Sequence, residues 1–169
     1  MIIKIAILVL IGIALVGIFA LTKTKSSPQT ASTNPKTPQS SPNLTADYTA
    51  SFAIYTKGTF RVFTSPKYHG LSQDVFIQKD NPNVVHVKKP QITWGDFFKT
   101  LPMELTKDCL TTGTKETFCT GNNGALKFYI NGQKMDNFLQ ETINPEDKAL
   151  ISFGNENDDQ IKLQLEKIQ

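Results

Sequence analysis

Residues 126–154 read LKFYINGQKMDNFLQETINPEDKALISFG, and this stretch decides the fold. Its first five residues alternate in character like a β-strand, and Asn131-Gly132 directly after them is the strongest two-residue signal for a hairpin. A corner at 144–147 places proline second in a turn and leads into KALISFG, in which alternate residues are apolar. The stretch therefore predicts a hairpin followed by a further core strand.

Helices are predicted on either side of this region. Residues 155–169 have an acidic start and a lysine near the end, as the helix dipole favours, and an apolar face of Ile161, Leu165 and Ile168. Upstream, Thr93 is a good N-cap and Asp96 adds a negative charge to the first turn of a short helix that ends at Pro102.

Strand signals fill the region between 52 and 87. Apolar residues alternate on both sides of Lys57-Gly58, which predicts a hairpin, and the strands 74–78 and 84–87 flank a polar corner with Pro82. The fold class expected is α+β, with mostly antiparallel strands, one short helix and a C-terminal helix.

Cys109 and Cys119 are the two cysteines of the chain. The polar stretch between them contains Gly113, which could take the positive φ of a hairpin turn, so the two arms would bring the sulfurs face to face. Redox catalysis usually uses Cys-x-x-Cys, and zinc needs two more ligands at matched spacing. We therefore predict a structural disulfide, which forms in an oxidising compartment.

The N-terminal residues 1–22 contain the run IIKIAILVLIGIALVGIFAL. At about 1.5 Å per residue its apolar part covers roughly 26 Å, close to the thickness of the bilayer core. The alternative is a cleaved signal peptide, whose apolar region is usually shorter. We predict a single-pass transmembrane anchor, with the rest of the chain outside the cell because of the disulfide, although the lysines after the run mildly favour the reverse orientation.

Residues 23–47 are rich in Ser, Thr, Pro, Gln and Asn, which predicts a disordered linker that lifts the domain 48–169 off the membrane. Asn43 matches the N-glycosylation pattern, with an unmodified linker as the alternative. Four of the 18 basic residues precede Asp47, which leaves 14 against the 15 acidic residues. Such a near-neutral domain without a basic stripe does not fit a nucleic-acid binder.

The order of PKY, VVHV, ITWGDFFKTL, the two cysteines, LKFYINGQ and INPEDKALISFGNE resembles an uncharacterised family of membrane-anchored or secreted proteins from archaea and small-genome bacteria. Members of that family hold several histidines around the second motif, whereas this chain has only His69 and His86. The C-terminal half is also similar to β-grasp, ubiquitin-like modules. Sulfur carriers of that fold end in Gly-Gly, but here Gly154 is followed by a helix, so the similarity implies the fold and not the carrier function.

Sequence motifs of enzymes, such as a nucleophile elbow, a phosphate-binding glycine loop or His-Glu-x-x-His, are absent from the chain. The function expected is therefore a non-catalytic interaction or assembly domain, without a cofactor, that binds an unknown protein partner at the cell surface. Trp94, Phe97, Phe98 and Leu101 have helical spacing and are expected to pack in the core, with a place on a binding surface as the alternative for Trp94. The alternative function is copper or zinc binding by His86 and His69 with Asp74 or Asp80.

Overall fold

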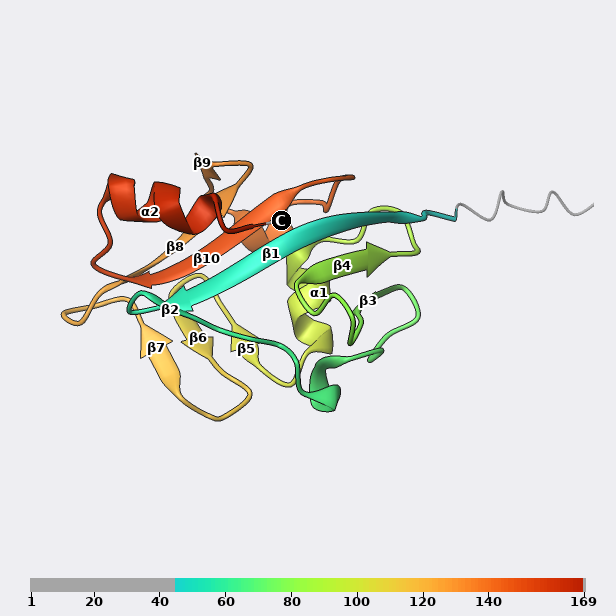
Figure 1. The fold of residues 1–169 in the computed structure, drawn as a ribbon, viewed down its shortest axis with the longest axis horizontal. Coiled ribbons are helices and arrows are strands. Elements are labelled where there is room, and N and C mark those ends of the chain that lie inside the picture. The colour runs from blue at the N-terminus through green and yellow to red at the C-terminus, as the bar shows by residue number, and fades with distance from the viewer. Residues whose placement is uncertain (1–44, 169) are drawn as a thin grey trace, which may run out of the picture. The chain divides into compact units, whose positions relative to one another are not determined.

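The computed structural model describes residues 45–168, and the account below concerns this part of the chain. A main sheet has the strand order β3-β4-β1-β10-β8-β9, with β2 paired to β1, and a small sheet has the order β5-β6-β7 (Figure 1). The strands are β1 Tyr48–Thr56, β2 Thr59–Phe60, β3 Val75–Ile77, β4 Val84–Val87, β5 Glu104–Leu105, β6 Cys109–Thr111, β7 Thr117–Cys119, β8 Ala125–Ile130, β9 Gln133–Lys134 and β10 Lys148–Gly154. The helices are η1 Pro66–Tyr68, α1 Trp94–Thr100, η2 Phe138–Gln140 and α2 Asp158–Leu165. The α+β class with a short helix and a C-terminal helix is confirmed.

The centre of the main sheet is the parallel pair β1 and β10, in which Phe52 lies opposite Ala149 and Ile54 opposite Ile151. The other strand pairs of this sheet are antiparallel. Because both faces of the central strands are covered, β10 is buried from Ala149 to Gly154 and carries apolar residues on both sides.

One face of the sheet packs against α1, the small sheet and the loops, and aromatic rings fill this core. Phe52 contacts the rings of Phe63, Phe97 and Phe98 at centroid distances of 5.1–5.8 Å. On the opposite face α2 covers a smaller cluster, which contains Ala53, Tyr55, Leu150, Ile161 and Ile168. The two faces follow directly from the alternation of side chains along β1.

Helix α1 starts with the capping box that the sequence indicates. The Thr93 hydroxyl accepts from the Asp96 backbone N–H, and the Asp96 carboxylate accepts from the Thr93 backbone N–H at 3.2 Å. The Thr93 hydroxyl also donates to Asp96 Oδ2 at 2.7 Å. This hydrogen bond, followed by the one from the Thr93 backbone N–H, holds the pKa of Asp96 below its usual value. The helix ends at Thr100, with Leu101 as its C-cap.

Both predicted two-residue turns are present. The φ angles are 51° and 74° at Lys57-Gly58 and 52° and 81° at Asn131-Gly132, as the twist of a tight hairpin requires. The Asn131 side chain also donates to Asp147 Oδ1 at 2.8 Å and accepts from the Lys148 N–H at 2.9 Å. The turn at 131–132 is therefore fixed to the start of β10.

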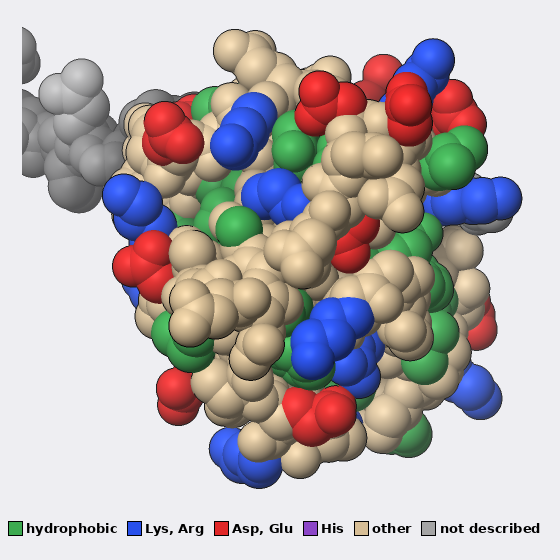
Figure 2. Space-filling view, turned by 90° about the vertical axis from the view of Figure 1, so that its left-hand side faces the viewer, with side chains coloured by type: hydrophobic (Ala, Val, Ile, Leu, Met, Phe, Trp, Pro, Cys, Tyr) green, Lys and Arg blue, Asp and Glu red, His purple; other side chains and the backbone are tan. Residues whose placement is uncertain are grey.

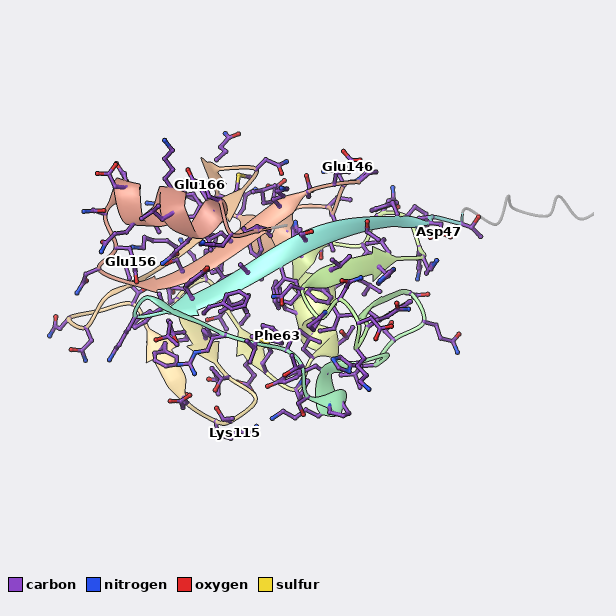
Figure 3. All side chains as sticks on the ribbon, in the orientation of Figure 1. Asp47, Phe63, Lys115, Glu146, Glu156 and Glu166 are labelled. Carbon is purple, nitrogen blue, oxygen red and sulfur yellow. A yellow bond between two sulfur atoms is a disulfide. The ribbon has the colours of Figure 1, made fainter. Side chains whose placement is uncertain are left out.

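A nearly buried ion pair holds the β1–β2 turn. Glu156 accepts from Lys127 Nζ at 3.2 Å and from the Gly58 N–H at 3.1 Å, and its side chain is 7% exposed. Burial raises the pKa of Glu156, but hydrogen bonds from its own backbone N–H, from Lys127 and from Gly58, with the charge of Lys127, outweigh burial and bring the pKa below its usual value. Figure 3 shows Glu156 beside this turn.

The predicted anchor at 1–22, most of the linker and Asn43 lie outside the described residues. Across 45–168 the structure contains no helix that is long and apolar enough to cross a membrane. The 3₁₀ helices η1 and η2 were not predicted, and neither were two features of the strands. One is the strand β5, and the other is the parallel pairing of β1 with β10.

Candidate functional site

The cysteine hairpin forms as predicted. Cys109 on β6 and Cys119 on β7 lie directly opposite each other and are joined by a disulfide, with 4.1 Å between their Cα atoms. The N–H of Thr120 donates to the backbone carbonyl of Asp108 at 2.8 Å, so the cysteines occupy a non-hydrogen-bonded pair, where side chains on antiparallel strands are closest. The turn lies at Gly113 as predicted, but the positive φ is at Lys115 and not at Gly113.

Gly113 also allows the hairpin to pack closely against Tyr68. A Cβ at this position would overlap the Tyr68 hydroxyl, and the Gly113 carbonyl accepts from Lys67 Nζ at 3.0 Å. The hairpin therefore touches η1 on its way to the tip at Lys115, which Figure 3 shows pointing away from the main sheet.

The four residues of the alternative metal site each have a different contact or location in the structure. His69 Nε2 lies 2.8 Å from the Phe63 carbonyl, and the His86 ring stacks on Phe76 at 5.3 Å. Asp74 pairs with Lys89 at 3.3 Å. Asp80 lines a hollow of about 320 Å³ at the start of β4.

Burial and then the charge of Lys88 lower the pKa of His86, with Asp47 opposing them, so neutral imidazole is favoured. Among residues 45–168 no group of three or more His, Cys, Asp or Glu side chains is placed to hold a metal ion. The structure does not bring the predicted ligands together.

Trp94 is not a surface residue. Its side chain is 0% exposed and stacks on Phe138 at a centroid distance of 5.6 Å. Its backbone N–H donates to the Glu141 carbonyl, which ties the start of α1 to η2. The expected core position of Trp94 is confirmed, and the alternative of an exposed binding residue is wrong, because the first turn of α1 faces the aromatic core.

One candidate surface lies between the segment after β2 and the cysteine hairpin. It is a groove of about 210 Å³, with Ile54, Phe63 and Leu110 among its apolar lining residues. Phe60 and Val62, which are 40% and 63% exposed, lie along it. Phe63 points inward from this segment in Figure 3.

Arg61 secures one side of this groove. Its guanidinium pairs with Glu116 at 3.1 Å and lies 5.2 Å from the centre of the Phe118 ring, both on the hairpin.

On the face of the domain seen in Figure 2, acidic and basic side chains alternate and hydrophobic side chains form small patches. This face has the mixed charge expected for a near-neutral domain.

A second candidate surface lies between β5 and helix α1 and has a volume of about 470 Å³. Its lining is Gly95, Phe98, Lys99, Met103, Glu104, Leu105, Thr106, Leu139 and Gln140. Phe98 is buried, and Met103, Leu105 and Leu139 are half-buried. We call this surface the β5–α1 groove.

The β5–α1 groove runs along the edge of a sheet. Four consecutive residues, 103–106, line the groove. Successive side chains of a strand point to opposite faces, so a groove lined by all four runs along the edge of the strand and not over one face. Helix α1 and η2 form the other wall. This arrangement can hold an elongated ligand between a strand edge and a helix. No sequence signal indicates the β5–α1 groove, because β5 has only two residues and is too short to show an alternation of polar and apolar residues.

Comparisons with family models, with curated proteins and with solved structures gave no match for this chain.

Proposed function

We propose that this chain is a membrane-anchored, extracytoplasmic interaction or assembly module without catalytic activity, which binds a protein partner at the cell surface. The observation that carries the proposal is the β5–α1 groove, which combines an apolar lining with an open strand edge. The addition of an extended peptide to an exposed sheet edge is a recurring mode of protein recognition.

The proposed location rests on two features. The first is the disulfide between Cys109 and Cys119, because such bonds persist in oxidising compartments. The second is the apolar segment within 1–22, which has the length of a membrane anchor. Together they favour a domain outside the cell that is tethered through the linker at 23–47.

We also propose that the C-terminal half is β-grasp-like, as its sequence similarity implies, and that β1 completes this arrangement in the main sheet. Its support is the topology, in which the first and last strands, β1 and β10, are parallel neighbours at the centre. Helix α1 comes between β4 and β8, which lie on opposite sides of that central pair. Membership of the uncharacterised archaeal and bacterial family stays a prediction from the sequence motifs.

Copper or zinc binding by His69 and His86 is the weaker alternative. His69 already contacts a backbone carbonyl and His86 stacks on a phenyl ring, so neither side chain supports it. Metal analysis of the purified full-length chain tests this alternative directly.

Photo-crosslinking in intact cells tests the proposed function. A photoreactive residue in place of Leu105, inside the groove, is expected to give one discrete adduct with a partner protein. The same residue in place of Lys134, on the exposed strand β9, is the matched control and should give none. Absence of an adduct at position 105, or equal adducts at both positions, would contradict the proposal.

Protease added to the same cells tests the orientation. The domain should be digested while the membrane is intact, because we place it outside. Protection that lasts until the membrane is opened would show the reverse orientation.

A further inference from the structure

We propose, resting on the interaction function above, that the partner binds in the β5–α1 groove as an extended peptide segment that adds a strand to the edge of β5. The occupant is then a polypeptide backbone, recognised by main-chain hydrogen bonds to Leu105 and by apolar contacts in the groove.

The hydrogen-bond pattern of the small sheet shows which groups of β5 are free. The Thr106 N–H donates to the Cys109 carbonyl at 2.8 Å, so this pair is a hydrogen-bonded one. The register places Glu104 opposite Thr111 and Leu105 opposite Leu110. Since inward and outward groups alternate along an antiparallel strand, the N–H and C=O of Leu105 point away from β6.

Strand β5 is at the end of its sheet, and no described strand pairs with it on the outer side. The N–H and C=O of Leu105 therefore form a donor and acceptor pair at the edge along which the groove runs. A peptide strand has a free N–H and C=O at the matching spacing. The N–H and C=O groups of a helix are already bonded to each other within the helix.

The groove supplies contacts for the side chains of an added strand. Phe98 and Leu139 lie on its far wall, and Met103 and Leu105 lie on the side of β5. In strand addition the main chain provides affinity and pockets for alternate side chains provide specificity. The inserted segment would therefore need an apolar residue directed toward Phe98.

Charges at the rim favour a peptide with both signs of charge. Lys99 has a side chain that is 80% exposed, and its nearest acidic partner, Asp96, is 3.5 Å away. Glu104 is exposed on the opposite wall. A polyanion would be repelled by Glu104, whereas a mixed sequence can pair with both walls.

The groove also has rigid walls. Gly95 packs so closely on η2 that a Cβ at this position would come within 2.5 Å of the Leu139 carbonyl oxygen. The capping box at Thr93 fixes the start of the same helix. A preorganised wall reduces the entropy lost when a flexible segment binds.

The experiment selects peptides from a displayed random library on the full-length chain in lipid nanodiscs, and then measures their affinity for two variants. Leu105→Pro removes the outward N–H but leaves the ladder to β6, because that N–H is not part of it. We expect Leu105→Pro to weaken binding by roughly tenfold or more. Thr117→Pro is the matched control, because it removes an outward N–H at the other edge of the small sheet, and it should have no effect.

A second measurement does not depend on folding of a variant. The selected peptides are made again with alternate amide nitrogens methylated, and these should lose binding to the unmodified chain. Hydrogen exchange of residues 103–106 should slow when the unmethylated peptide binds.

Strand addition would be wrong if no peptide is selected, if methylation is tolerated, or if Leu105→Pro binds as tightly as the unmodified chain. If one of these results is found but a partner is still crosslinked at position 105, the proposed interaction function stands and only strand addition is refuted.

Discussion

Removal of the disulfide should destabilise the domain by an amount set by the loop that it closes. The perturbation is the double change Cys109→Ser and Cys119→Ser. The cysteines are 10 residues apart, and the chain-entropy relation then gives about 2.7 kcal/mol at room temperature. We expect the domain to stay folded, because Leu110 is fully buried and Phe118 packs on Phe153 at 5.3 Å.

The measurement is the free energy of unfolding of the full-length chain in denaturant, with the disulfide variant beside the unmodified protein. The neighbouring pair Thr111→Ser and Thr117→Ser is the matched control, because it changes the same strands and leaves the bridge; we expect a change within about 0.5 kcal/mol. A loss below about 1 kcal/mol for the disulfide variant would refute the argument from loop entropy.

The same bond has a chemical test. In protein purified without reductant, both cysteines should resist thiol alkylation until the protein is reduced and unfolded, because the bond removes both nucleophiles. Full alkylation of native, unreduced protein would remove the bridge and with it the main reason for an extracytoplasmic location.

Three further predictions concern turns, charge and packing. Gly132→Val should lower the free energy of unfolding by more than about 1 kcal/mol because φ is 81° there, and an unchanged value would contradict the turn. Glu156 has a lowered pKa, so its stabilising effect is fully present above the ordinary pKa of a glutamate and is lost as the pH falls through the lower pKa of the folded state. Denaturant titrations should therefore show less stability lost in acid for Glu156→Gln than for the unmodified chain, and equal losses would exclude this ion pair as a cause. Gly95→Ala should reduce the thermal midpoint and widen the gap to Leu139, and a neutral result would mean that η2 moves freely.

Local chemistry made several elements predictable. The two glycine turns follow from residues that accept positive φ, and the start of α1 follows from a threonine N-cap with an acidic residue three positions on. The disulfide was predictable because its arms are close in the chain, so a short hairpin is enough to bring the sulfurs together.

Other features depend on contacts between distant segments. Trp94 has the spacing of an amphipathic helix, but whether its ring is exposed depends on Phe138, which lies far along the chain and covers it. Gly113 lies in the predicted turn, but the reason that only glycine fits there is the nearby Tyr68 of η1 and not a positive φ. Neither partner can be identified from the residues near these positions.

The sequence by itself determined α1, α2, most of the strands, the two glycine turns and the disulfide, because hydrophobic periodicity, capping and turn chemistry act over a few residues. Only the tertiary structure decided that β1 and β10 are parallel neighbours and that β5 has an open edge beside α1. The physical reason is that strand pairing is selected by the total burial of both sheet faces, which sums contacts over the whole domain. The candidate site belongs to this second category, since its walls come from segments that meet only after folding.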